Sequence, residues 1–229
     1  MLQLAVLPAV ILLVYVYRLD PMEKEPAGLL LSLLLCGMLS TFPAVLLELL
    51  GTEVFLGGGE PNDLETLAFE NFIIVALVEE GCKFFFLRWR TWKDPHFDYV
   101  FDGIVYAVFV GLGFAIAENI LYVFNYGISV AFVRAVTAIP GHCMFGIFMG
   151  CFYGKAKLAD AKGNAGERAG NQTCAILVPV FCHGSYDTLA SIDSDLSSLL
   201  FFALLVLMVV TGIRLMKRMS AQAERISWY

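Results

Sequence analysis

Four apolar segments of this sequence carry ionisable or amide side chains where a lipid-facing helix would carry leucine or valine. These side chains are Glu79, Glu80 and Lys83 in "VALVEEGCK", Glu118 and Asn119 in "FAIAEN", Arg134 and His142 in the following segment, and His183 and Asp187 in "HGSYD". A charge at the bilayer centre costs about 2.5–3.5 kcal/mol on insertion scales, and such residues usually face a bundle interior and mark function. We therefore expect these residues to share one site.

The spacing within two of these groups indicates acid–base chemistry. Glu79 and Glu80 precede Lys83 by four and three residues, so the lysine can neutralise one carboxylate and leave the other as a general base. Asp187 follows His183 by four residues, so its carboxylate can accept one ring N–H and set the imidazole tautomer. Peptide hydrolysis also needs a group that stabilises developing negative charge, and Asn119 or Lys83 could supply it.

A metal site is the alternative way to activate water. Glu118, His142 and His183 could hold Zn²⁺, with Glu79 or Glu80 as the base, because two histidines and a glutamate with an open fourth position form a known zinc arrangement. The sequence contains no HExxH motif, so this set depends on three helices converging. Metal dependence stays open at this point, as does the choice of base between Glu79 and Glu80.

The elements that must position these residues are membrane helices. The chain has 229 residues, of which 59% are hydrophobic and 16% charged, with a mean hydropathy of +0.75; soluble domains average about 45–50% apolar and 25% charged residues. Segments of membrane-spanning length must be helical, since lipid offers no partners to the backbone. We predict a single all-α domain over residues 1–229 in a lipid bilayer, with no nucleic-acid partner. Its seven apolar segments lie near 1–17, 28–50, 67–87, 100–124, 129–153, 173–191 and 196–213.

Lysine and arginine predict the orientation. The stretches that follow the first, third, fifth and seventh segments contain lysine and arginine. The other connections, "GTEVFLGGGEPNDLET", "NYGIS" and "SIDSDLS", contain neither. The positive-inside rule therefore places the N-terminus outside and the C-terminus in the cytoplasm. At 1.5 Å per residue, Glu80 and His142 lie about 20 Å from the outer helix ends, His183 about 13 Å and Glu118 about 9 Å.

Further features concern helix packing and the residues around the site. Gly146, Gly150 and Gly154 form a stripe of small residues that suits close helix contact. Pro140 and Gly141 are expected to loosen the fifth segment just before His142. Glu48, near an outer helix end, is expected to extend to the membrane interface, and Arg134 and Asp187 are expected to support the site.

At this point the motifs resemble a known family. "EEGCK" is similar to an EExxK motif, "FAIAEN" to FxxxEN and "HGSYD" to HxxxD; with "FDGIVYAVFVGLGFAIAENILYV" they resemble the PrsW family of bacterial intramembrane proteases over nearly the whole chain. More distant relatives are the CAAX-prenyl endopeptidases and bacteriocin-immunity membrane proteases, whose second motif carries histidine where this chain has Glu118. That departure puts a transfer of their mechanism in doubt.

The resemblance implies a multi-pass protease of the bacterial cell membrane. It would make the first, extracytoplasmic cut in a single-pass anti-sigma factor during envelope stress, leading to sigma-factor release. Glu79 and Glu80 match the first motif, Glu118 the second and His183 the last, and His142 matches a further polar position. The family is often classed with metallopeptidases, so a zinc cofactor is a possibility that the sequence leaves undecided.

Two other classes of function compete with the protease. A proton-coupled transporter also buries Glu, His and Lys, although the inverted repeats typical of carriers are not found. A non-catalytic scaffold or immunity protein would keep the polar network for packing alone. Such a scaffold would tolerate Glu80→Gln, which neither a protease nor a carrier would.

Overall fold

The computed structural model describes residues 2–20, 23–222 and 224–227, and each of the seven predicted segments is helical there. The first two helices are α1 (Leu2–Leu19) and α2 (Ala27–Leu56). The third segment is a run of α3 (Leu64–Phe69), η1 (Glu70–Ala76) and α4 (Leu77–Thr91). It is followed by α5 (Asp102–Tyr126), α6 (Ile128–Val136), α7 (Ala138–Ala161), α8 (Ala165–Ser191) and α9 (Asp195–Gln222). The described residues contain no named strand, which confirms the all-α prediction.

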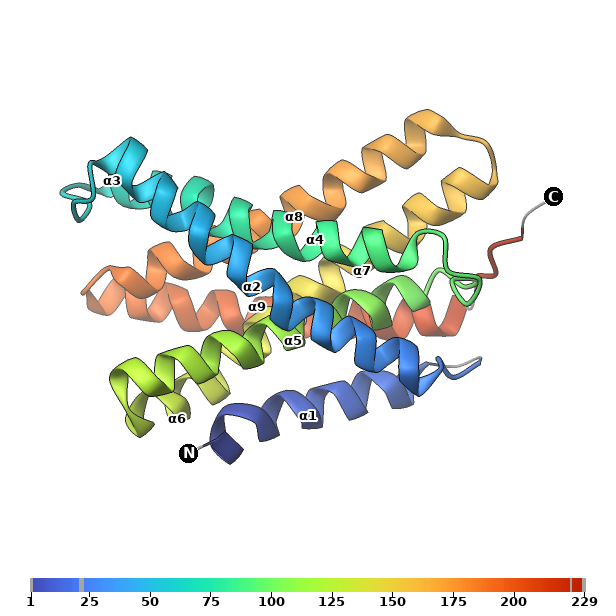
Figure 1. Cartoon of the computed structure of the whole chain (residues 1–229), viewed down its shortest axis with the longest axis horizontal. Coiled ribbons are helices and arrows are strands. Elements are labelled where there is room, and N and C mark those ends of the chain that lie inside the picture. Colours follow the sequence, from blue (N-terminus) through green and yellow to red (C-terminus); the bar gives the residue numbers. More distant parts are fainter. Residues whose placement is uncertain (1, 21–22, 223, 228–229) are drawn as a thin grey trace.

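The helices run roughly along one direction, and their connections gather at two ends (Figure 1). The turns after α2, α5 and α8 lie at one end, with the start of α1. The connections after α1, α4 and α7 lie at the other, with the end of α9. Every lysine and arginine of the chain except Lys83 and Arg134 belongs to this second end. The arrangement therefore agrees with the predicted orientation, in which the second end is cytoplasmic.

Length and composition distinguish two sets of helices in the described chain. Four stretches are long and apolar enough to cross a membrane: Ala27–Leu56, Asp102–Tyr126, Ile128–Ala161 and Asp195–Gln222. The stretch Val6–Leu19 is apolar but shorter. The third and sixth segments carry the paired glutamates and the HGSYD motif, so they are less hydrophobic. Their polar residues have to be covered by the other helices.

Helix α5 forms the centre of the bundle, and glycine lets its neighbours approach closely. A Cβ atom on Gly113 would lie 2.2 Å from the backbone oxygen of Leu34 in α2, and one on Gly154 of α7 would lie 2.1 Å from that of Val100. A Cβ on Gly150 would lie 2.4 Å from the backbone oxygen of Gly103. Only glycine fits such contacts. The predicted packing function of the stripe on α7 is thereby confirmed.

Two helix irregularities differ from the expected regular segments. Residues Glu70–Ala76 form a π-helix directly before the paired glutamates, a rare geometry that is frequent at functional sites. The fifth segment breaks at Thr137, between α6 and α7, and not at Pro140–Gly141 as expected. Pro140 lies in the first turn of α7, where its missing N–H removes no helical hydrogen bond.

Candidate active site

The paired glutamates and Lys83 form the centre of a buried polar network. Lys83 Nζ lies 2.9 Å from Glu79 Oε2 and 2.7 Å from Glu80 Oε1, and all three side chains are buried. The ammonium group also lies 3.9 Å from the centre of the Phe114 ring. The lysine thus contacts both carboxylates, whereas the spacing was expected to let it neutralise one and leave the other free.

On one side the network continues through His142 to Glu118. Lys83 Nζ lies 3.2 Å from His142 Nδ1, and His142 Nε2 lies 2.9 Å from Glu118 Oε2. An ammonium group only donates, so His142 Nδ1 must accept and Nε2 must carry the proton that it donates to Glu118. Arg134 completes this side, because its Nη2 lies 2.8 Å from Glu118 Oε2 and its Nε donates to Asn119 Oδ1 at 2.6 Å.

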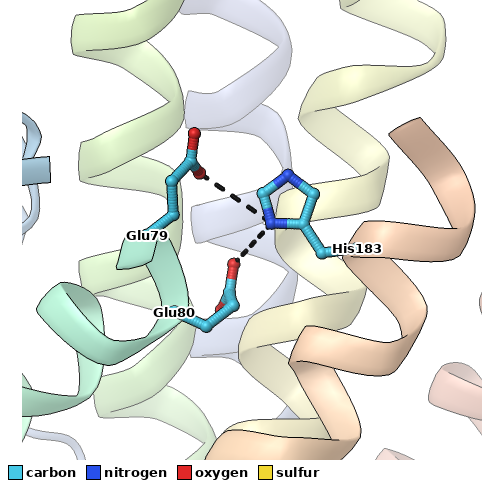
Figure 2. Close-up of side chains that lie close together, drawn as sticks. All are labelled: Glu79, Glu80 and His183. Carbon is cyan, nitrogen blue, oxygen red and sulfur yellow. Dashed lines mark hydrogen bonds and ion pairs between the residues drawn. The ribbon is translucent and has the colours of Figure 1, made fainter. Parts of the chain in front are cut away.

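On the other side the network continues through His183. Its Nδ1 lies 3.0 Å from Glu80 Oε1 and 3.9 Å from Glu79 Oε2, while its Nε2 lies 3.1 Å from Asp187 Oδ2. Figure 2 shows the imidazole of α8 pointing at both glutamates of α4. The ring of Phe145 stacks on the imidazole at 4.8 Å between centroids and limits its rotation. All the predicted site residues therefore lie in one connected network.

The network borders a cavity of about 430 Å³. Its walls include Glu79, Glu118, Arg134, His183 and Asp187, while Glu80, Lys83, Asn119 and His142 lie behind them. The remaining lining residues come mainly from the non-cytoplasmic ends of α2, α5 and α8 and from η1. They are Thr41, Val45, Glu48, Asn71, Val75, Phe114, Leu121, Tyr122, Asn125, Tyr126 and Ser191. A polar cavity reaching the site from the outer side is thus available to a substrate.

The excess negative charge of the network favours the binding of a cation. The network holds four carboxylates and two permanent cations: Lys83 contacts Glu79 and Glu80, Arg134 contacts Glu118, and Asp187 contacts His183. Its formal charge is therefore −2 if both histidines are neutral. Uncompensated charge is costly in a low-dielectric interior. A divalent metal ion would cancel this charge, and a second proton on His183 would cancel half of it.

One group of side chains in the described part of the chain could share a metal ion. Ligand atoms of Glu79, Glu80 and His183 lie within 4.8 Å of one another, and carboxylate oxygen and imidazole nitrogen both suit Zn²⁺. This group shares only His183 with the predicted set of Glu118, His142 and His183. In that set Glu118 contacts His142, and the two imidazole rings lie 5.4 Å apart between centroids. The predicted metal set stays a prediction.

Sequence reasoning missed some polar residues of the cavity. Glu48 was expected to extend to the interface, yet its Oε1 is buried and the side chain lines the cavity. Thr41 and Asn71 are also buried and line it. The seven-residue spacing of Thr41 and Glu48 on one helix was the available signal. Asn71 had no comparable signal, because its direction depends on the π-helix.

Buried Glu, His and Lys groups beside a polar cavity in a polytopic helical membrane protein are typical of a membrane-embedded hydrolase. The comparisons with known proteins identify which one. The model of the PrsW family of intramembrane metalloproteases matches residues 25–213, so the chain belongs to that family.

Curated relatives cover most of the chain. Protease PrsW of Bacillus subtilis is 35% identical over 180 residues, which are 79% of this chain and 78% of that protein. Protease PrsW of Geobacillus kaustophilus is 37% identical over 80% of this chain and 76% of its own length, and that of Oceanobacillus iheyensis is 33% identical over 91% of each. No solved structure matches. The chain is thus a multi-pass intramembrane protease of the cell membrane, as the motifs predicted.

Proposed function

We propose that this protease makes the first, extracytoplasmic-side cut in a single-pass membrane anti-sigma factor, in response to envelope stress. The observation that carries the proposal is the cavity that joins the outer helix ends to Glu79, Glu118 and His183. A peptide bond near the outer side of a transmembrane substrate could enter it without crossing the bilayer. Family membership supports peptide hydrolysis as the reaction.

Glu79 is the proposed general base. It is the member of the glutamate pair that lines the cavity, and Lys83 is its only donor within 3.5 Å among the described residues. Glu80 Oε1 instead accepts hydrogen bonds from both Lys83 and His183, at 2.7 and 3.0 Å. The Glu80 residue is 1% exposed. Glu80 thus holds Lys83 and His183 in place, while Glu79 keeps a free oxygen for a water molecule.

The remaining polar groups are proposed to stabilise the developing negative charge and to protonate the leaving amine. Arg134 lines the cavity and lies close enough to Glu118 to be held there, so its guanidinium could stabilise a developing oxyanion. Asn119, predicted for that purpose, lies behind the wall and accepts from Arg134, which makes it a positioning residue in this proposal. His183, held by Asp187, could carry a proton to the leaving amine.

A divalent metal is the alternative way to activate water at this site. Glu79, Glu80 and His183 would then be its ligands, in place of the proton-transfer roles given above to Glu79 and His183, and the excess of carboxylates over permanent cations in the network favours it. When bound, Zn²⁺ would supply Lewis-acid activation of water at this position. His142, Lys83 and Glu118 would then keep the hydrogen bonds that orient the network.

Reconstituted protein and a tagged single-pass anti-sigma factor in liposomes test the proposal. Wild type should cut the substrate, whereas Glu79→Gln should lower kcat by at least about 100-fold, in the range lost when a general base is removed. Glu80→Gln should lower activity as well, because it frees both Lys83 and His183. Normal cutting by Glu79→Gln would show that the base is misassigned. No cutting by wild type across several anti-sigma factors would contradict the proposed substrate class.

A further inference from the structure

Three polar side chains in the cavity wall have no hydrogen-bond partner among the described residues. They are Thr41 and Glu48 of α2 and Asn71 of η1, whose unpaired atoms Oγ1, Oε1 and Nδ2 are buried. Thr41 and Asn71 are 5% and 7% exposed. Buried polar groups in proteins are nearly always paired, so a shared wall of unpaired ones requires an explanation. We refer to Thr41, Glu48 and Asn71 as the polar row.

Helix packing brings these residues to one wall. Thr41 and Glu48 are seven residues apart in α2, which is two helical turns, or about 10.5 Å along the axis. Gly51, one turn beyond Glu48, packs against Ile74, because a Cβ at Gly51 would lie 2.9 Å from Ile74 Cγ2. Asn71 is three residues before Ile74. The contact between α2 and η1 therefore places Asn71 on the same side as Glu48.

The row has the chemistry that an unwound peptide backbone needs. A substrate helix satisfies its own N–H and C=O groups, but an extended segment inside the membrane loses those bonds and finds no water in the lipid. The Glu48 carboxylate accepts from an N–H, the Asn71 amide nitrogen donates to a C=O, and the Thr41 hydroxyl can do either. The spacing of about 10.5 Å between Thr41 and Glu48 matches about three residues of extended chain.

We propose that the polar row binds the backbone of a locally unwound, roughly three-residue segment of a transmembrane substrate and holds it beside Glu79. The inference rests on the proposed proteolytic function. On binding, the substrate backbone supplies the hydrogen-bond partners that these side chains do not find within the described residues. Selectivity then follows from how easily a substrate helix unwinds. A substrate with Gly near the cut site should be preferred over one with Leu there.

Binding can be measured separately from cutting. The probe is a fluorescent synthetic peptide with about 20 apolar residues and a central Gly-Gly pair, in liposomes that contain the Glu79→Gln protein. Thr41→Val and Asn71→Leu, each added to that background, should weaken binding about 3- to 10-fold per lost hydrogen bond. Thr52→Val is the matched control, since Thr52 belongs to α2 but does not line the cavity. It should leave binding unchanged.

Backbone esters in the peptide identify the group that is bound. An ester in place of one amide near the Gly-Gly pair removes a single N–H donor. It should weaken binding to the Glu79→Gln protein, and the same ester should weaken binding less once Glu48→Met has removed the side-chain acceptor. A structural effect of Glu48→Met would instead leave the ester's effect unchanged. Thr41→Val nearly preserves side-chain shape, and its melting temperature should equal that of the parent.

The outcomes separate this inference from the proposed function. Peptide binding that depends on the polar row supports the inference. If wild type nevertheless cuts none of the anti-sigma factors, the proposed function is contradicted while the inference stands. Cutting by wild type, with peptide binding that Thr41→Val and Asn71→Leu leave unchanged, overturns the inference alone. Absence of peptide binding by the Glu79→Gln protein also overturns it. If Asn71→Leu does not fold, Thr41→Val and the ester scan still decide.

Discussion

Lys83→Met should strongly destabilise the protein, because it removes the ammonium group that contacts both paired glutamates. Lys83 is 2% exposed, and its Nζ lies 2.9 Å from Glu79 and 2.7 Å from Glu80. Methionine fills nearly the same volume but leaves two buried carboxylates side by side. Removing one partner of a buried ion pair costs about 3–5 kcal/mol, and we expect a loss of that size in the free energy of unfolding.

A second substitution tests whether charge is the cause. Adding Glu80→Gln to Lys83→Met removes one of the two stranded carboxylates. The double variant should therefore be more stable than Lys83→Met alone, by about 0.5–3 kcal/mol. Lys93→Met is the control, since Lys93 is exposed beyond the end of α4 and should change stability by less than about 0.5 kcal/mol.

The assay is denaturant unfolding in detergent micelles, followed by tryptophan fluorescence, with protease activity measured on the same samples. Lys83→Met should also lose activity, because His142 and both glutamates lose the ammonium group that contacts all three. A loss in the free energy of unfolding below about 1 kcal/mol, with no recovery in the double variant, would refute the reasoning. It would mean that the two carboxylates are compensated without the lysine.

Three further predictions concern packing, pH and metal. Gly113→Val should lower the free energy of unfolding by at least about 1–3 kcal/mol, because its side chain would meet the Leu34 backbone oxygen; a melting temperature equal to wild type would contradict this contact. Burial raises the pKa of Glu25 from 4.5 to about 7, against the hydrogen bond that Tyr106 donates to it. Between these values the folded state binds the proton that the unfolded state has released, so stability should fall as pH rises from 4.5 to about 7 and level off above the folded-state pKa. Melting temperatures of Glu25→Gln should show a smaller fall from pH 5.5 to pH 8.5 than wild type, and an identical fall would exclude Glu25 as the cause. Mass spectrometry of protein purified with zinc should find about one ion per chain, and His183→Ala should weaken metal binding at least about 10-fold; zinc content equal in both would exclude His183 as a ligand.

The seven helical segments and the residues of the site could be predicted from the sequence because both depend on local patterns. Runs of apolar residues must become helices in lipid, and loop lysines and arginines set their direction. The high cost of a charge in the bilayer selected Glu80, Glu118 and His183 as functional residues. The spacing of Glu79 and Lys83 on one helix was enough to predict their ion pair.

Relations between helices were decided only by the tertiary structure. The sequence does not show that Glu79 faces the cavity while Glu80 faces Lys83 and His183, because the π-helix before them sets their direction. The fifth segment was expected to loosen at Pro140 and Gly141, whereas its helix breaks three residues earlier, at Thr137. Glu48 and Asn71 share a cavity wall because Gly51 lets α2 pack on η1. The sequence shows which polar groups lie in apolar segments and are therefore costly to bury. The partner that offsets this cost comes from another helix, so it depends on how the helices pack.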